Sequence, residues 1–461
     1  MIGGKPGAGM ATQRQRIWGW WFFDWASQPY NTLLLTFVFG PYFAEIATAH
    51  YLASGLDATA SGAAAQAMWG WGQTVSGVII ALLAPILGVV ADGSGKRMVW
   101  IWIFSAFYVL GSWMLWYLVP GEPDLTRALI WFGIGLIGME FATIFTNSLM
   151  PDLTGDSDMG KVSGSGYAFG YVGGIVALVI MLLLLAENSA TGKTLIGLDA
   201  LFGLNPEARE GTRSVGPLTA VWYIVFMVPF FLWVREPPVK KRVPVGQSLR
   251  ELWALILSLK DRQSLGAHLL SSMFYRDALN ALYAFGGVYA SGVLGWSITQ
   301  IGVFGIAGAM SAALFAWLGG KMDSARGPKP VINLSMAVLI VVCLVIAGMS
   351  RTDFFGMPFA SDSALPDQIF YACGILIGAA GGTLQSASRT MMVFHTTRDR
   401  ATEAFGLYAL SGKATSFIAP FSIALFTTLS GSQRMGIAVP LIALFLVGMV
   451  LLRWVKPMGE R

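Results

Sequence analysis

The chain has 461 residues, of which 55% are apolar and only 12% are charged. This composition excludes an ordinary soluble globular protein and indicates a protein embedded in a lipid bilayer. The net charge of +5 does not indicate nucleic-acid binding, because the basic residues gather on one side of the predicted membrane spans.

Runs of about 20 apolar residues, the length that crosses a hydrocarbon core, recur along the whole chain. They predict an all-α membrane protein with twelve transmembrane helices in two pseudo-symmetric six-helix halves. In chain order the expected spans cover residues 18–45, 68–91, 98–119, 128–150, 164–186, 217–234, 264–293, 298–320, 330–349, 367–394, 402–429 and 435–453.

The spans divide the chain into three predicted parts. Residues 1–234 form the N-terminal half, residues 235–262 a cytoplasmic linker, and residues 263–461 the C-terminal half. The linker is rich in proline and basic residues, and apolar residues recur at helical spacing within 248–260. We therefore expect an amphipathic helix on the membrane surface there.

The distribution of positive charge predicts the orientation in the membrane. With the N-terminus in the cytoplasm, most of the 30 Lys and Arg residues fall on the cytoplasmic side, as the positive-inside rule requires. Residues 1–15 are polar and have no apolar core, so no cleavable signal peptide is expected. The sequence thus predicts a multi-pass membrane protein with both termini in the cytoplasm.

A short pattern occurs twice, as GVVADGSGKR at residues 88–97 and as GGKMDSARGPK at residues 319–329. In each copy small residues end an apolar run, and an Asp, a glycine-bearing turn and basic residues follow. Such a repeat indicates two similar halves. We expect these loops to form a cytoplasmic gate, not the binding site. The predicted gate residues are Asp92, Lys96, Arg97, Asp323, Arg326, Arg389 and Glu403.

Charged residues also occur inside the predicted spans, where each costs on the order of 3 kcal/mol near the bilayer centre. Three are acidic and three are basic, so the set can be neutral as a whole, which favours pairing across a central cleft. They are Asp24, Glu140, Asp277, Arg276, Arg389 and Lys413.

The three carboxylates, Asp24, Glu140 and Asp277, are the candidates for proton coupling, because buried carboxylates serve as proton relays in transporters. The alternative for each is a fixed hydrogen bond that holds neighbouring helices together. For Asp24 a contact with a substrate ammonium is a third possibility.

The basic residues Lys413 and Arg276 are candidates to hold a substrate carboxylate. For Lys413 an ion pair between helices is the alternative. Arg276 and Asp277 are adjacent and project about 100° apart on a helix, so at least one of them should bind another helix. For Arg389 and Glu403 we expect an ion pair at the gate.

Neutral residues near mid-depth complete the candidate binding site. Polar side chains in membranes often bind only the neighbouring helix, and the aromatic ones often only pack. These candidates are Asn31, Asn280, Gln385, Tyr30 and Tyr408.

The remaining chemistry-bearing residues predict no catalytic, metal or cofactor site. His50, His268 and His395 are too scattered to share a metal, and Cys343 and Cys373 lie inside apolar runs. The glycines lie inside spans, without the strand and helix that flank a nucleotide-binding loop. We expect a protein that is not an enzyme and needs no cofactor.

Several longer motifs resemble one known family. They are FDWASQPY at residues 23–30, NSLMP at 147–151, SGSGYAFGYVGG at 163–174, QSASR at 385–389 and FGLYALSGKATSF at 405–417. Together they are similar to the autophagy-type vacuolar effluxer family of the major facilitator superfamily. The resemblance implies the major facilitator fold and the export of amino acids. One departure is that Asp277 is followed by Ala278 instead of glycine and preceded by Arg276.

The sequence and the resemblance together predict a secondary transporter that exports amino acids or similar zwitterions in exchange for protons by alternating access. The predicted partners are a small-molecule substrate, protons and the lipid bilayer, and we expect a monomer. A first alternative keeps the fold but carries an amphiphile, drug, sugar or peptide-like solute. A second is a membrane scaffold or sensor that transports nothing.

Overall fold

The computed structural model describes residues 11–188, 191–236, 246–247, 250, 257, 262–294, 296, 298–360, 363–414, 417–430 and 432–459. Contacts between residues divide the chain into two compact units. Unit 1 comprises Met1–Leu83, Ser94–Asn147 and Val172–Lys240, and unit 2 comprises Ala84–Gly93, Ser148–Tyr171 and Lys241–Arg461. Unit 2 therefore contains two short segments from the first half of the sequence.

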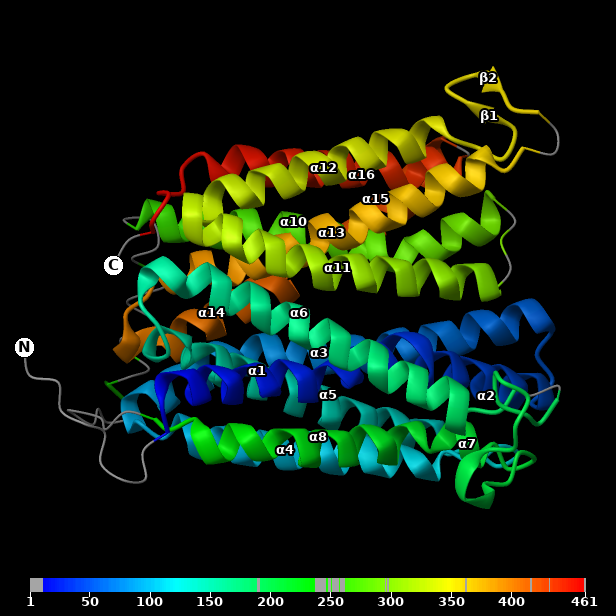
Figure 1. Ribbon diagram of the computed structural model, residues 1–461. Helices are drawn as coiled ribbons and strands as arrows, with labels where there is room; N and C mark the ends of the chain where they lie inside the picture. Colours follow the sequence, from blue (N-terminus) through cyan, green and yellow to red (C-terminus); the bar gives the residue numbers. More distant parts are fainter. Residues whose placement is uncertain are drawn as a thin grey trace, which may run out of the picture. The chain divides into compact units, whose positions relative to one another are not determined.

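Unit 1 is built from long helices and their connections (Figure 1). Its elements are α1 (Gln13–Pro29), the π-helix η1 (Tyr30–Phe37), α2 (Phe39–Ala53), most of α3 (Ala58–Ser94), α4 (Arg97–Met114), η2 (Leu115–Tyr117), α5 (Leu125–Ser148), the second part of α6 (Met159–Ile180), η5 (Met181–Leu185), η6 (Leu201–Gly203), α7 (Glu210–Arg213) and α8 (Val215–Trp233). Pro29 ends the regular part of α1, since proline cannot donate the helical hydrogen bond. The first predicted span is therefore three helical segments in succession.

Close helix packing in unit 1 depends on small residues. A Cβ added at Gly111 of α4 would lie 2.3 Å from the backbone nitrogen of Gly135 in α5. The two backbones therefore touch, as small residues permit between membrane helices.

Unit 2 contains the helices that follow the linker, together with the beginning of α6. Its elements are η3 (Met150–Asp152), η4 (Asp156–Asp158), α10 (Gln263–Gly292), α11 (Ile298–Arg326), α12 (Pro328–Gly348), β1 (Asp353–Phe354), β2 (Met357–Pro358), α13 (Leu365–Phe394), η7 (Arg398–Arg400), α14 (Ala401–Ala414), α15 (Ile418–Ser430) and α16 (Gln433–Leu452). Figure 1 shows α10, α11, α12, α13 and α16 running alongside one another. Tyr275, Met336, Phe370 and Phe445 belong to its buried core.

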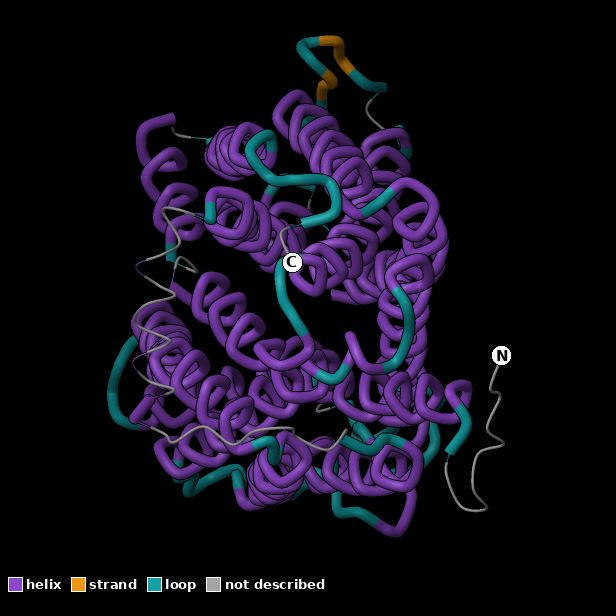
Figure 2. Tube along the Cα trace, turned by 90° about the vertical axis from the view of Figure 1, so that its left-hand side faces the viewer, coloured by secondary structure: helices purple, strands orange, loops and turns teal. Residues whose placement is uncertain are grey.

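The short antiparallel strands β1 and β2 form a hairpin between α12 and α13 that extends beyond the helices (Figure 2). Its turn is formed by Phe355 and Gly356, which both have positive φ angles of 50° and 81°. Glycine adopts this conformation without strain.

Ten helical segments in the described ranges are long and apolar enough to cross a membrane. The predicted count of twelve is thus not reproduced in full. The span predicted at 264–293 is the continuous helix α10, but polar and charged residues along it lower its mean hydropathy. The span predicted at 402–429 is divided into α14 and α15, each shorter than the roughly 20 residues that cross a bilayer.

Most of the predicted linker, residues 235–262, lies outside the described residues, and so does nearly all of the amphipathic helix expected within 248–260. The three-part division of the chain stays a prediction. Cys343 and Cys373 are both buried and free.

Candidate functional site

Asp277 lies on α10 and is 4% exposed. Its Oδ2 accepts a hydrogen bond of 2.8 Å from the backbone N–H of Ala419. Ala419 is the second residue of α15, which begins at Ile418. The carboxylate therefore binds one of the N–H groups that have no partner within the first turn of a helix, where a negative charge is also favoured.

Arg276 binds the preceding helix, α14. Its Nη1 donates to the backbone oxygen of Tyr408 at 2.8 Å, and its Cζ lies 4.1 Å from the centre of the Tyr408 ring. A Cβ added at Gly412 would come within 2.6 Å of the same Cζ. Glycine thus leaves room for the guanidinium beside α14.

Two adjacent residues of opposite charge therefore bind the two helices of the divided span, one residue to each helix. Arg276 binds the middle of α14, and Asp277 binds α15 at its beginning. This agrees with the expectation that at least one of them binds another helix. A guanidinium suited to a carboxylate and a carboxylate suited to a proton or an ammonium thus occupy neighbouring positions on α10.

Three hydroxyl groups are linked beside this pair. The Tyr408 hydroxyl is 2.5 Å from Oγ of Ser388, which also forms a hydrogen bond with the Tyr275 hydroxyl. The sequence singled out Tyr408 for this site. It missed Ser388, although that residue lies inside the QSASR motif.

Gln385 and Arg389 of α13 bind the part of α6 that belongs to unit 2. Gln385 Nε2 donates to the Tyr171 hydroxyl at 3.0 Å. Arg389 donates from Nε to Ser163 Oγ at 2.9 Å and from Nη2 to the Ser163 backbone oxygen at 2.6 Å. Its Cζ lies 4.1 Å from the centre of the Tyr167 ring. Arg389 is therefore firmly held in this structure.

Asp92 lies near the end of α3 and binds the beginning of α14. Its Oδ2 accepts a hydrogen bond of 2.8 Å from the backbone N–H of Glu403, the third residue of that helix. The Glu403 carboxylate binds Nε and Nη2 of Arg400 at 2.8 and 2.9 Å. Among the described residues, the observed salt-bridge partner of Glu403 is Arg400 and not the predicted Arg389. Arg400 is nearer because it lies one helical turn before Glu403.

The second copy of the repeated loop contacts the beginning of α6. Asp323 is 2% exposed, and a Cβ added at Gly160 would lie 2.7 Å from its Cγ. The next residue, Ser324, accepts a hydrogen bond of 2.8 Å from the backbone N–H of Lys161 through its Oγ. Each loop thus lies against the first turn of a helix, Asp92 against α14 and Asp323 against α6. Arg326 is exposed at the end of α11.

The basic end of the first loop belongs to unit 1. Lys96 is exposed and Arg97 is buried at the start of α4. The carboxylate of Glu236 accepts hydrogen bonds from the backbone N–H groups of Arg97 and Met98, at 2.9 and 3.2 Å. Glu236 therefore caps α4, a contact that the sequence did not reveal.

The other candidates of unit 1 lie on three elements. Asp24 of α1, Asn31 of η1 and Glu140 of α5 are each half-buried. Tyr30 is fully buried, and its hydroxyl donates to the Phe132 backbone oxygen at 2.6 Å. The structure thus shows a packing contact for Tyr30, and the ligand-binding roles of all four stay predictions.

Two further candidates belong to unit 2. Asn280 lies on α10 one turn after Arg276 and is exposed. Lys413 lies on α14, and its side chain is outside the described part of the structure.

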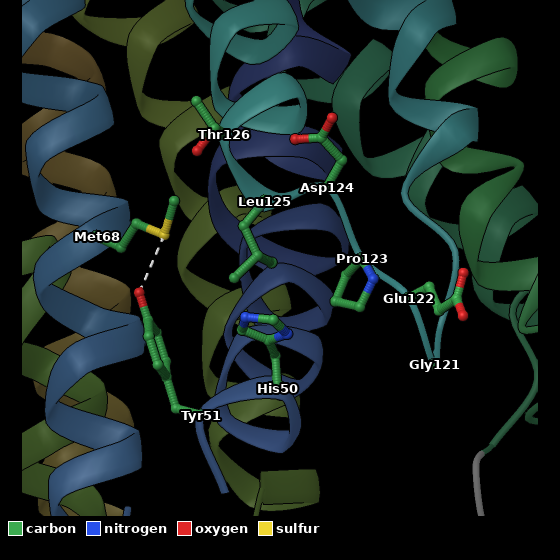
Figure 3. Close-up of a pocket in the computed structure, with 9 residues that line it drawn as sticks. All are labelled: His50, Tyr51, Met68, Gly121, Glu122, Pro123, Asp124, Leu125 and Thr126. Atoms are coloured by element: carbon green, nitrogen blue, oxygen red, sulfur yellow. Dashed lines mark hydrogen bonds between the residues drawn. The ribbon is translucent and has the colours of Figure 1, made fainter. Parts of the chain in front are cut away.

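Two hollows in the described part of the chain lie away from the charged pair of α10. The larger, of about 660 Å³, lies in unit 1 where α2, α3 and α5 meet the connection before α5 (Figure 3). His50, Tyr51 and Met68 line it, and the Tyr51 hydroxyl lies 3.4 Å from the Met68 sulfur. It is an open surface hollow, and none of the residues that line it is among the predicted binding, coupling or gate residues.

The smaller hollow, of about 180 Å³, lies in unit 2 at the end where α13 stops and α14 starts. It is lined by Arg262, Leu265, His395, Thr396, Thr397, Arg400, Glu403, Ala404 and Leu407.

Comparison with known proteins identifies relatives of the whole chain. Residues 12–458 match the family described as "Vacuole effluxer Atg22 like". An uncharacterized MFS-type transporter of Bacillus subtilis, YxiO, is 26% identical over 442 residues, which cover 95% of this chain and 94% of that protein. Autophagy-related protein 22 of Cryptococcus neoformans is 22% identical over 311 residues, covering 65% of this chain and about half, 51%, of the fungal protein.

Solved structures of major facilitator superfamily transporters share the fold. The match with the proton:xylose symporter XylE covers 96% of this chain and 94% of the XylE chain, at a TM-score of 0.65 and 11% identity. The match with the human organic anion transporter MFSD10 covers 97% of this chain and 100% of the MFSD10 chain, at a TM-score of 0.66 and 14% identity. Likeness at this level of identity shows the fold alone.

These matches confirm the fold class and the family that the motifs indicated. They also identify a transporter and not an enzyme. The chain is an integral, multi-pass membrane transporter of the major facilitator type and belongs to the Atg22-like vacuole effluxer family.

Proposed function

We propose that this transporter exports amino acids or similar small zwitterions in exchange for protons. The observation that carries the proposal is the pair Arg276 and Asp277, which places opposite charges at neighbouring positions of α10. A zwitterion offers a carboxylate for the guanidinium and an ammonium group for the carboxylate. Charge-assisted hydrogen bonds of both kinds are about twice as strong as neutral ones.

Proton coupling follows from the same residues. A proton on Asp277 removes its negative charge and so weakens its bond with the Ala419 N–H at the start of α15. Proton binding is thereby linked to the position of a membrane helix. Asp24 and Glu140 of unit 1 are the alternative coupling residues, and Lys413 is the alternative carboxylate ligand. Asn31, Asn280 and Gln385 would orient the ligand by hydrogen bonds.

Alternating access would use the two repeated loops as latches. Asp92 holds the start of α14, and Asp323 lies against the start of α6. The Asp92 contact favours the start of α14 through a negative charge, whereas Asp323 packs against Gly160 at the start of α6. Both contacts must break for that end of unit 2 to open. We propose that this end faces the cytoplasm of a bacterial cell, as do both termini, and that the protein acts as a monomer.

The family and its relatives support export but leave the cargo open. The family description names an effluxer, whereas transporters of the same fold are named for xylose and for organic anions. A site with a guanidinium and a carboxylate side by side is better matched to a zwitterion than to an uncharged sugar. An organic anion would use Arg276 alone.

The experiment is transport in liposomes that contain the purified protein. Labelled neutral, basic and acidic amino acids, xylose and a dicarboxylate are each tested with and without an imposed pH gradient. We expect the gradient to drive at least one amino acid and not xylose. Gradient-driven transport of the sugar or the dicarboxylate, with no amino acid moved, would replace the proposed cargo. No movement of any solute would contradict transport of the proposed kind.

A further inference from the structure

His268 occupies an unusual position for an ionisable side chain. It lies on α10, one and a half turns after the helix begins, and is 0% exposed. Neither ring nitrogen has a hydrogen-bond partner among the described residues. A buried polar group without a partner costs free energy, so its presence calls for an explanation beyond packing.

Aromatic and basic groups surround His268 in a stack. Its ring lies 5.4 Å from that of His395 and 6.0 Å from that of Tyr408, with interplanar angles of 7° and 8°. The guanidinium of Arg276 lies over the same Tyr408 ring. The stack therefore connects the His395 end of unit 2 with the charged pair of α10.

Both ring nitrogens of His395 have hydrogen-bond partners. Its Nδ1 lies 2.9 Å from the Met391 backbone oxygen and must carry a proton to bind it. Its Nε2 lies 2.7 Å from Ser264 Oγ, which accepts the Lys456 backbone N–H at 2.8 Å. Both ring nitrogens of His395 are therefore occupied by hydrogen bonds. His268, by contrast, keeps a nitrogen lone pair that can take a proton without breaking a hydrogen bond.

A route for protons to this stack is suggested by two features. His395 lines the smaller hollow, of about 180 Å³. Polar residues recur every four positions on α10, at Ser264, His268, Ser272 and Arg276, and this spacing places them on one face of the helix. The polar face runs from the hollow to Arg276.

We propose that His268 is a proton-binding site that raises the affinity for substrate, linked to Arg276 and neutral in the state described here. The proton exchanged for substrate is the one on Asp277, and the proton on His268 is not exchanged. A proton on His268 adds a second positive charge beside the Tyr408 ring that Arg276 already covers. Repulsion in this poorly solvated region weakens the bond between Arg276 and the Tyr408 carbonyl. The guanidinium is thereby released for a substrate carboxylate.

The other charged and titratable groups around His268 support a neutral resting state. Arg276 is the nearby permanent cation, and Arg262, Arg400 and Lys456 lie towards the hollow and the end of the chain. The acidic group on that side, Glu403, is already bound to Arg400. Tyr275, Tyr408 and His395 contribute no negative charge. Among the described residues, a protonated His268 therefore has no counter-ion in this arrangement and favours a different one.

The proposal rests on the proposed function only for the role of Arg276, so its first test does not require transport. The chain has three histidines, and NMR of protein with labelled histidine can follow each imidazole. Single variants His50→Gln, His268→Gln and His395→Gln assign the three signals. We expect the His268 signal to titrate reversibly at pH values of about 5 to 8, the range of histidine switches. A His268 that stays neutral throughout this range in folded protein would overturn the proposal.

The second test uses counterflow of the transported amino acid without a pH gradient. In the unaltered protein we expect KM to fall severalfold as the pH is lowered through the His268 titration. The variant His268→Gln should lose this dependence, whereas His50→Gln, altered in the hollow of unit 1, should keep it. An unchanged pH profile in His268→Gln would contradict the link to Arg276. Failure of the unaltered protein to move any amino acid would instead contradict the proposed function, and the NMR result would still decide whether His268 binds a proton.

Discussion

The carboxylate of Asp277 on α10 accepts a hydrogen bond of 2.8 Å from the backbone N–H of Ala419, at the first turn of α15. A side chain of one helix thus stabilises the start of another, while its neighbour Arg276 binds α14. Any event that neutralises Asp277 acts directly on α15. The transport cycle that we propose depends on this contact.

The contact predicts different outcomes for two variants of Asp277. Asp277→Asn keeps an oxygen that can accept the Ala419 N–H but loses the charge, so the thermal stability should fall less than in Asp277→Ala while proton-driven transport is lost. Asp277→Ala removes the acceptor and should also destabilise the protein by about 1 kcal/mol, the usual effect of losing a helix cap. Thermal unfolding and transport are measured on both. Proton-driven transport by Asp277→Asn at the unaltered rate would exclude Asp277 as the coupling residue.

The variant Gly412→Ala tests whether the position of Arg276 matters for substrate binding. An alanine there would place its Cβ 2.6 Å from the guanidinium carbon and force Arg276 away from Tyr408. We expect Gly412→Ala to raise KM for the transported amino acid at least tenfold. The matched control is Gly77→Ala on α3, where a Cβ meets nothing within 4 Å. Equal KM values for the two variants would show that Arg276 does not position the substrate.

Asp92 should affect conformational cycling more than ligand affinity. Asp92→Asn keeps an acceptor for the Glu403 N–H but removes the charge that favours the start of α14. We expect turnover in liposomes to change severalfold while KM stays close to its original value. A pure loss of affinity with unchanged turnover would contradict the assignment of Asp92 to the gate.

The stability of the hairpin between α12 and α13 should depend on pH, because the hairpin contains the carboxyl group of Asp353. The hairpin lies outside the membrane-spanning helices. A hydrogen bond from the Ser350 hydroxyl, with help from Arg434, lowers the pKa of Asp353 below its ordinary value. A carboxyl with a lowered pKa in the folded state stabilises that state above its unfolded pKa of about 3.9. This stabilisation is lost as the pH falls through the lower, folded pKa.

Hydrogen exchange of the hairpin amides checks this dependence. Protection should be constant at neutral pH and should fall in acid. In Ser350→Ala the loss should begin at higher pH, because the pKa of Asp353 returns towards its ordinary range. Protection that is equal in the two proteins at every pH would show that the Ser350 hydrogen bond does not stabilise the hairpin.

Much of the fold could be predicted because hydrophobic length and repeats are local properties of the sequence. The apolar runs located most of the helices, and the motifs at residues 163–174 and 405–417 indicated the family that the comparisons show. The division of the predicted span 402–429 was missed, although Lys413, Thr415 and Ser416 interrupt its apolar residues before α15. Pro420, in the first turn of α15, is a further local signal that a helix starts there.

The site could be predicted as a set of residues but not as a set of contacts. The charges of Arg276 and Asp277 are visible in the sequence, whereas their partners are the backbone groups of Tyr408 and Ala419, which carry no sequence signal. Glu403 was expected to pair with Arg389 and instead binds Arg400. The polar face of α10, which includes His268, could have been predicted from the sequence, because its polar residues recur at a spacing of four.

The most direct test of the account compares proton-driven accumulation with counterflow for the Asp277→Asn protein in liposomes. Counterflow needs substrate binding and alternating access but no net proton movement. We predict that Asp277→Asn loses accumulation driven by a pH gradient and retains counterflow of the same amino acid at saturating concentration, with a raised KM because the amide no longer pairs with the ammonium group. Retention of gradient-driven accumulation would contradict the claim that the pair Arg276 and Asp277 couples protons to substrate.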